Sequence, residues 1–186
     1  DFNKTELSVL PYLSFQYQLN AKQNLLLSYR RSINRPDVYQ LYPSIVINNP
    51  FSVRKGNPLL EPESRDRIVA EHSIRFNGSY VSYRLFYEQV YNAINNLTFL
   101  NDSAAFETQV QNLGNIGQAG IQFLGSLKFG PLTISPSLRF YYQSTSGNSL
   151  AEQYNIEDRN NWVLDAGFSS VVSFGQDFAF SGTLQC

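Results

Sequence analysis

The sequence predicts an all-β fold, an antiparallel up-and-down meander of about eight strands that is part of a transmembrane β-barrel. Three observations predict it. Apolar and polar residues alternate along most of the 186 residues, 15% of which are aromatic, and such alternation is typical of strands whose two faces meet different surroundings. Short and long connections alternate between these segments, as in membrane barrels. Charged residues make up 16% of the chain, against roughly 25% in soluble domains.

Pairs of alternating segments joined by short turns build this meander. Asn77-Gly78 gives the clearest turn, because this dipeptide readily adopts the positive φ angles of a tight hairpin. The paired segments are 13–19 with 24–30, 67–76 with 81–88, 118–128 with 132–142, and 161–172 with 178–184. Short turns are predicted near 20–23, 77–78, 129–131 and 174–176, and long polar loops near 35–62, 93–112 and 144–160.

The residue types on the two faces favour a membrane barrel over a soluble β-sandwich. The polar face is mostly Ser, Gln, Asn and Thr with scattered Arg, Asp and Glu, as expected for a wet lumen. In a soluble sandwich, the solvent-exposed face is usually rich in Lys and Glu. Aromatic residues lie near the strand ends, where a barrel carries an aromatic girdle: Tyr29, Tyr87, Tyr142 and Trp162.

Composition also excludes several classes of function. A net charge of −1 without a basic patch gives no sign of a nucleic-acid partner. Cys186 is the one cysteine, so neither a disulfide framework nor a cysteine zinc site is expected. His72 is the one histidine and falls on the apolar face, whereas the adjacent Ser73 points to the opposite face. We therefore predict no enzyme activity, no metal site and no cofactor.

A family resemblance rests on three segments of the first long connection and its flanks. An arginine-rich strand end at 29–36 is followed by Leu-Tyr-Pro at 41–43 and by Gly-Asn-Pro-Leu-Leu-Glu-Pro-Glu at 56–63. Together they resemble the barrel of TonB-dependent outer-membrane receptors of the Bacteroidota type. A second, shorter match lies at 112–121. The residues that carry the first match are Arg31, Arg35, Pro36, Gly56, Asn57, Pro58, Leu60, Pro62 and Glu63.

The resemblance implies a location, a mechanism and partners. It places the chain in the bacterial outer membrane, in contact with lipid, as part of a receptor that imports a bulky nutrient with energy delivered through TonB. Ferric siderophores, corrinoids and oligosaccharides are the nutrient classes it implies. Such barrels have about 22 strands around a plug, and at about 10 residues per strand they need roughly 220 residues in strands. We therefore expect residues 1–186 to be a partial barrel domain, with the remaining strands, the plug and the TonB-contacting region outside it.

The motif residues also have an architectural interpretation. Pro36, Pro58 and Pro62 end or stiffen extended segments, and Gly56-Asn57 supplies a turn. Charged side chains at the same rim are expected to form a network across the strand pair, which would hold the register; contact with a ligand is the alternative role for them. The network residues are Arg30, Arg31 and Arg35 with Glu61, Glu63 and Asp66.

Aromatic and cationic loop residues are the candidates for ligand binding. Aromatic faces stack on sugars or aromatic chelators, and cations attract anionic metal chelates. The alternative is that these side chains cover the barrel mouth or pack on one another. The candidates are Tyr39, Tyr42, Phe51, Arg54 and Lys55 in the first long loop, and Phe99 and Phe106 in the second.

Two other functions remain open at this point. The first is a complete small outer-membrane barrel with a structural or adhesive role. The second is a soluble all-β module that binds a glycan.

Overall fold

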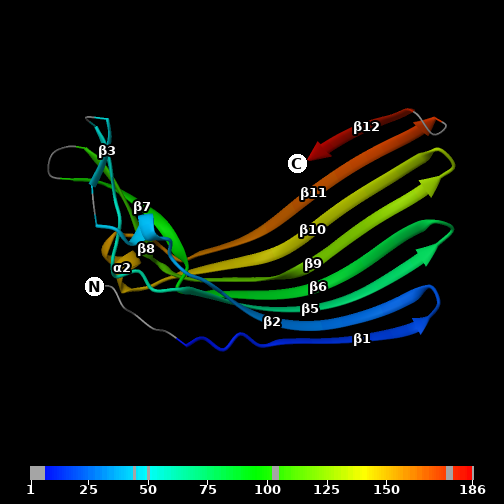
Figure 1. Ribbon diagram of the computed structural model, residues 1–186, viewed down its shortest axis with the longest axis horizontal. Helices are drawn as coiled ribbons and strands as arrows, with labels where there is room; N and C mark the ends of the chain where they lie inside the picture. Colours follow the sequence, from blue (N-terminus) through cyan, green and yellow to red (C-terminus); the bar gives the residue numbers. More distant parts are fainter. Residues whose placement is uncertain (1–6, 44, 50, 102–104, 175–177, 186) are drawn as a thin grey trace.

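Eight strands form one curved antiparallel sheet in which each strand pairs with the next one along the meander (Figure 1). The structure is a computed structural model that describes residues 7–43, 45–49, 51–101, 105–174 and 178–185. Its strand order confirms the predicted meander. The strands of this main sheet are β1 (Tyr12–Asn20), β2 (Gln23–Asn34), β5 (Glu63–Phe76), β6 (Ser79–Tyr91), β9 (Gly114–Phe129), β10 (Leu132–Gly147), β11 (Arg159–Phe174) and β12 (Phe178–Gln185).

Tight turns join the strands at one end of the sheet, as the sequence predicts. Asn77 and Gly78 have φ angles of 47° and 75°, the positive values that a tight hairpin of this kind requires. Gly130 has a φ of 61° in the β9–β10 turn. Most of the turn predicted near 174–176 lies outside the described residues.

The long connections at the other end contain secondary structure, so their prediction as plain polar loops is wrong. Four short strands form a second sheet in the order β3-β4-β8-β7. In it β4 pairs in parallel with β8, which is more than 50 residues away in the chain. The strands are β3 (Ile45–Asn49), β4 (Ser52–Lys55), β7 (Ile94–Leu100) and β8 (Phe106–Asn112), and two short helices, α1 (Val38–Leu41) and α2 (Ser149–Gln153), lie in the first and third connections.

Cross-strand pairing gathers the apolar side chains of the main sheet into rows on one face. Leu85 and Leu164, in the middle row, are 60% and 63% exposed. A contiguous apolar surface across seven strands is far larger than the patches that soluble monomers show. This face therefore meets lipid. The middle row consists of Phe15, Leu27, Ala70, Leu85, Ile121, Phe140 and Leu164.

An aromatic row marks the end of the apolar face nearest the long connections. Tyr29, Tyr87, Tyr142 and Trp162 all lie in it, so the residues predicted to form a girdle share one level. The Trp162 ring stacks on Phe140 at 5.0 Å between centroids. The next row outward is polar: Arg31, Asp66, Gln89, Gly117, Ser144 and Asn160.

The height of the apolar face suits a bilayer. Along β10 it extends from Tyr142 in the aromatic row to Leu132 at the tight turn, and a spanning strand needs about 9–11 residues. No helix in the described part of the chain is long and apolar enough to cross a membrane.

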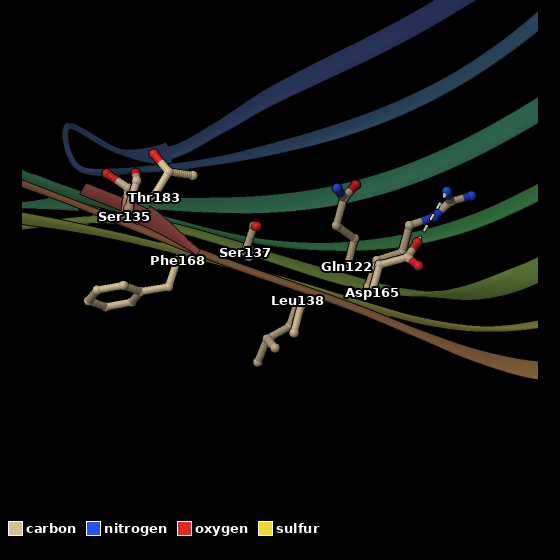
Figure 2. A pocket seen from close by; sticks show the side chains of 11 residues that line it. Gln122, Ser135, Ser137, Leu138, Asp165, Phe168 and Thr183 are labelled. Carbon is tan, nitrogen blue, oxygen red and sulfur yellow. Dashed lines mark ion pairs between the residues drawn. The ribbon is translucent and has the colours of Figure 1, made fainter. Parts of the chain in front are cut away.

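The opposite face of the sheet is polar. Figure 2 shows Ser137, Gln122 and Thr183 pointing to one side of the sheet, whereas Leu138 and Phe168 point to the other. Ser137 and Leu138 are neighbours in β10, so the alternation read from the sequence is confirmed in this part of the sheet.

Candidate ligand-binding site

Asn57 of the sequence motif ties the first long connection to the second. Its side-chain amide donates to the Val110 carbonyl at 3.2 Å and to Gln111 Oε1 at 2.8 Å, both in β8. Its Oδ1 accepts the Leu59 backbone N–H at 2.9 Å. Asn57 is only 7% exposed, so these partners replace the water that the amide loses. Asn57 is therefore a buried tether that holds the first long connection against the second.

Gly56 is required beside this tether because the backbone of the first connection folds closely over it. A Cβ at position 56 would collide with the carbonyl oxygen of Tyr42 and lie 2.9 Å from that of Gln40. The neighbouring Asn57 N–H donates to the same Gln40 carbonyl at 2.6 Å. Any side chain here would push the α1 segment away from the motif.

Asn112, at the end of β8, joins all three long connections. Its amide donates to the carbonyls of Glu61 at 3.0 Å and Asn92 at 2.8 Å. Its own carbonyl accepts from the side chain of Asn148, the N-cap of α2, at 2.7 Å. The Ile94 N–H also donates to the carboxylate of Glu63, the last motif residue, at 3.2 Å. The connections therefore form one hydrogen-bonded assembly above the sheet.

The charged network predicted at this rim forms only in part. Arg31 lies 3.6 Å from Asp66, as expected, but Arg30 points to the opposite face because it is the next residue in the same strand. Arg35 donates to Ser8 Oγ at 3.4 Å. The carboxylates of Glu61 and Glu63 bond Asn92 and Arg65 instead. The other predicted cross-strand pairs are therefore wrong.

The seven ligand-binding candidates fall into three places. Tyr39 and Tyr42 lie on and beside α1, where both are exposed. Lys55 and Phe99 share one face of the small sheet by register, and Arg54 and Phe106 share the other. Phe51 lies between β3 and β4, next to Phe106.

The face of the small sheet with Arg54 and Phe106 carries an exposed patch, called here the loop patch. Leu100 and Phe106 are paired across β7 and β8 and are 62% and 58% exposed. The Phe106 N–H donates to the Phe51 carbonyl at 2.8 Å. The loop patch consists of Arg54, Thr98, Leu100, Phe106 and Thr108, which the register places on one face, and the two threonine hydroxyls are 2.9 Å apart.

This composition gives the loop patch a definite chemistry. The Phe106 ring and Leu100 offer apolar contact, Arg54 offers a positive charge, and the threonine hydroxyls offer hydrogen bonds. A planar or ring-shaped ligand that also carries negative or hydroxyl groups fits this combination.

On the opposite face of the small sheet, Phe99 is packed against another loop residue. Its ring lies 5.5 Å from that of Tyr154, which follows α2. The alternative interpretation, that loop aromatics pack on one another, therefore applies to Phe99. Tyr154 is a partner that the sequence reading did not single out.

The polar face of the main sheet carries a ladder of charged and amide side chains at mid-height. Arg84 donates to Glu71 Oε2 through Nε at 3.0 Å and Nη2 at 2.6 Å, and to Gln122 through Nη1 at 3.0 Å. Further along the same row, Arg139 lies 4.0 Å from Asp165. Among the described residues, no group of three His, Cys, Asp or Glu side chains is placed to hold a metal ion.

Two aromatic rings are buried on this polar face, which the alternation pattern does not predict. Phe86 and Tyr141 are 6% and 9% exposed, with ring centroids 6.2 Å apart. The Arg139 guanidinium covers both rings at 4.6 and 4.3 Å. Gly120 lies between them in the register, where a Cβ would collide with the backbone of β10.

The two charge pairs of the ladder are expected to differ in strength. Glu71 and Arg84 are largely covered, so a double-mutant cycle with Glu71→Gln and Arg84→Gln should give a coupling of about 1.5–3 kcal/mol. The Arg139–Asp165 pair is 4.0 Å apart and Asp165 is half-exposed, so it should give about 0–1 kcal/mol. Unfolding free energies in lipid measure both values, and equal couplings would contradict this geometry.

Comparison with known proteins supplies the family context. A model of the outer membrane protein beta-barrel family matches residues 1–186. A search of the curated proteins finds no match. The siderophore receptor PirA from Pseudomonas aeruginosa is similar in structure, with a TM-score of 0.62 at 13% identity over 95% of this chain and 38% of that one.

Two further solved receptors are also similar in structure to this chain. A variant of the ferric enterobactin receptor PfeA from Pseudomonas aeruginosa, in complex with enterobactin, has a TM-score of 0.55 at 13% identity over 95% of this chain and 34% of its own. PirA from Acinetobacter baumannii has a TM-score of 0.50 at 11% identity, and the match covers 95% of this chain and 36% of that one. At these identities the likeness concerns the fold. The chain spans little more than a third of the length of these receptors.

Proposed function

The chain belongs to the outer membrane protein beta-barrel family and is an outer-membrane protein, and from this premise we propose that it forms part of the barrel wall of a TonB-dependent receptor. The receptor imports a bulky nutrient. Its energy comes from the inner membrane through TonB, which it contacts outside residues 1–186. The remaining barrel strands and a plug complete it.

One observation carries this proposal. The main sheet has a lipid-facing apolar face and a polar face, and its three long connections are bonded into one assembly at one end. Its fold resembles part of a siderophore receptor, with 38% of the PirA chain covered. A wall segment of a large barrel accounts for both findings. The polar face then lines the lumen, and the long connections lie outside the cell.

The loop patch supports a role for these connections in capturing the nutrient. Ferric siderophores and corrinoids combine ring surfaces with polar or charged groups, and oligosaccharides present rings and hydroxyls. The similar receptors are described as receptors for siderophores and for ferric enterobactin, which favours an iron chelate among the three. We assign the first contact with the nutrient to Arg54 and Phe106.

A small, self-closed barrel with a structural or adhesive role is the other candidate. It requires β12 to pair with β1, and these strands lie at the two ends of the sheet order. The proposed larger barrel is consistent with that order. A soluble glycan-binding module does not account for the exposed apolar rows.

Uptake by cells tests the proposal. Cells carrying the full-length receptor gene, or its deletion, are given ⁵⁵Fe-enterobactin, labelled cobalamin or a labelled oligosaccharide. We expect accumulation of one probe that depends on the gene and is lost when a protonophore collapses the proton gradient. Accumulation of none, or uptake indifferent to the protonophore, would refute it.

Substitution in the loop patch should weaken capture. Phe106→Ala or Arg54→Ala is expected to raise the half-saturation concentration for the accepted probe about two- to tenfold, because one stacking or charge contact is lost. The maximal rate should stay the same. Tyr39→Ala is the matched control, since this 90% exposed residue lies on α1 outside the patch; an equal effect at position 39 would contradict the assignment.

A further inference from the structure

One edge of the small sheet has no neighbouring strand. The sheet order is β3-β4-β8-β7, so β7 is paired on its β8 side only. The small sheet stands at the end of the main sheet away from the tight turns (Figure 1). The free edge of β7 therefore lies among the long connections, which the proposed function places outside the cell.

Hydrogen bonds at the two ends of β7 show which backbone groups this edge exposes. The Asn101 N–H donates to the Ala105 carbonyl at 2.9 Å, toward β8, whereas the Ile94 N–H donates away from β8, to Glu63 at 3.2 Å. Successive residues of an antiparallel strand alternate between these two directions. In the part of the chain that the structure describes, nothing hydrogen-bonds the remaining outward N–H and C=O groups. They belong to Asn96, Thr98 and Leu100.

This edge lacks the features that usually prevent a further strand from pairing. Charged residues, proline and bulges are the common ones. The β7 sequence, INNLTFL, contains neither a charged residue nor proline, and its register against β8 runs without a shift. At the opposite edge of the same sheet, the pairing of β3 shifts register between Ile47 and Asn49. The β7 edge is therefore an open template for one more strand.

Apolar side chains flank the free edge on both faces of the small sheet. Leu100 and Phe106 of the loop patch are exposed on one face. On the other face, the Phe99 ring contacts the exposed Tyr154. Side chains of an added strand would alternate between these two faces, so both sets would meet apolar surface. Main-chain hydrogen bonds together with such alternate side-chain contacts are what recognition by strand addition requires.

We propose that the β7 edge binds an extended, uncharged segment of another polypeptide, which joins the small sheet as a further strand. A segment of about five residues covers the three outward positions. The described long connections are already used elsewhere: the first supplies β3 and β4, the second β7 and β8, and the third α2. The inference rests on one part of the proposed function, that these connections face the cell exterior.

Peptide binding to intact cells that carry the full-length receptor tests this inference. The probe is a randomised library of linear heptapeptides displayed on phage, depleted first on cells with the gene deleted. The enriched peptide is then synthesised with a fluorescent label, and we expect it to bind saturably. Asn96→Pro removes an outward N–H but leaves the β7–β8 hydrogen bonds in place, as proline on a strand edge does. The dissociation constant should therefore rise about tenfold.

Two control variants separate the backbone contact from other effects. Asn96→Ala removes the side chain but keeps the N–H, so the peptide should bind as it does to the wild type. Val38→Pro introduces proline at the first position of α1, after Asp37, whose backbone is already extended. It should fold normally and also bind the peptide with unchanged affinity.

Three results would overturn the inference. The first is a library from which no peptide is enriched, and the second is an equal loss of binding in Asn96→Ala and Asn96→Pro. The third is slow amide hydrogen exchange at Asn96, Thr98 and Leu100 without peptide, because another strand of the receptor or a second copy would then already occupy the edge.

The failure of this inference can be told apart from failure of the proposed function. Protonophore-sensitive uptake by cells that bind no peptide, whether intact or permeabilised, refutes strand addition alone. Peptide binding that appears only after the outer membrane is permeabilised supports strand addition, but it refutes the placement of the long connections outside the cell.

Discussion

Replacing Leu138 by arginine is expected to destabilise the folded protein in lipid by about 2–4 kcal/mol, whereas Ser137→Arg should be nearly neutral. The two residues are neighbours in β10 but point to opposite sides of the sheet (Figure 2). Leu138 lies between the aromatic row and the tight turn, so its charged replacement would sit near the bilayer midplane. Ser137 points to the polar face, where an arginine side chain would stay hydrated.

Refolding into lipid vesicles over a urea titration measures both free energies. Phe123→Arg is a second test of the apolar face, because Phe123 pairs directly with Leu138 and shares its row. It should cost about as much as Leu138→Arg. Equal costs at positions 137 and 138 would mean that the two faces of the sheet do not meet lipid and water as assigned.

Asn57→Ala is expected to release the first long connection from the second. The change leaves the Val110 carbonyl and the Leu59 N–H without their side-chain partner in a covered site, and each such group costs about 1–3 kcal/mol. The main sheet should stay folded, since Asn57 lies outside it. Proteolysis of intact cells should then cut within residues 35–62 faster than in the wild type, and nutrient capture should weaken.

Asn96→Ala is the control for this experiment. Asn96 is an exposed asparagine of β7, in the same small sheet, with its side chain outside the tether. Its substitution should change neither the cleavage rate nor capture. Comparable sensitivity of the two variants would show that Asn57 does not hold the connections together.

The main sheet could be predicted from the sequence because its signals are local. Alternation with period two fixes which side chains share a face, and Asn77-Gly78 fixes the register of its hairpin. The aromatic row follows from the same local pattern, since residues at equal depth in paired strands lie side by side. The local pattern therefore predicts that Tyr87, Tyr142 and Trp162 belong to one aromatic girdle.

The small sheet could not be predicted because its pairing is distant. Its β4 strand has four residues and is paired in parallel with a segment more than 50 residues away, which no local pattern records. The role of Asn112 depends in turn on that pairing. The burial of Phe86 and Tyr141 cannot be predicted for another reason. The alternation pattern predicts only polar side chains on the polar face, whereas the Arg139 guanidinium stacks on both rings and lets them lie there.

The separation of β1 from β12 tests the central claim, that this sheet is one wall of a larger barrel. Spin labels at Tyr17→Cys and Gly182→Cys, with Cys186→Ser, can be placed in the full-length protein in native membranes. Double electron–electron resonance then measures their distance. Eight strands about 4.8 Å apart span roughly 34 Å along the sheet, so a larger barrel predicts a distance of roughly 25–35 Å. A distance below about 15 Å would mean that β1 and β12 close on each other, and the chain would then be a small barrel of its own.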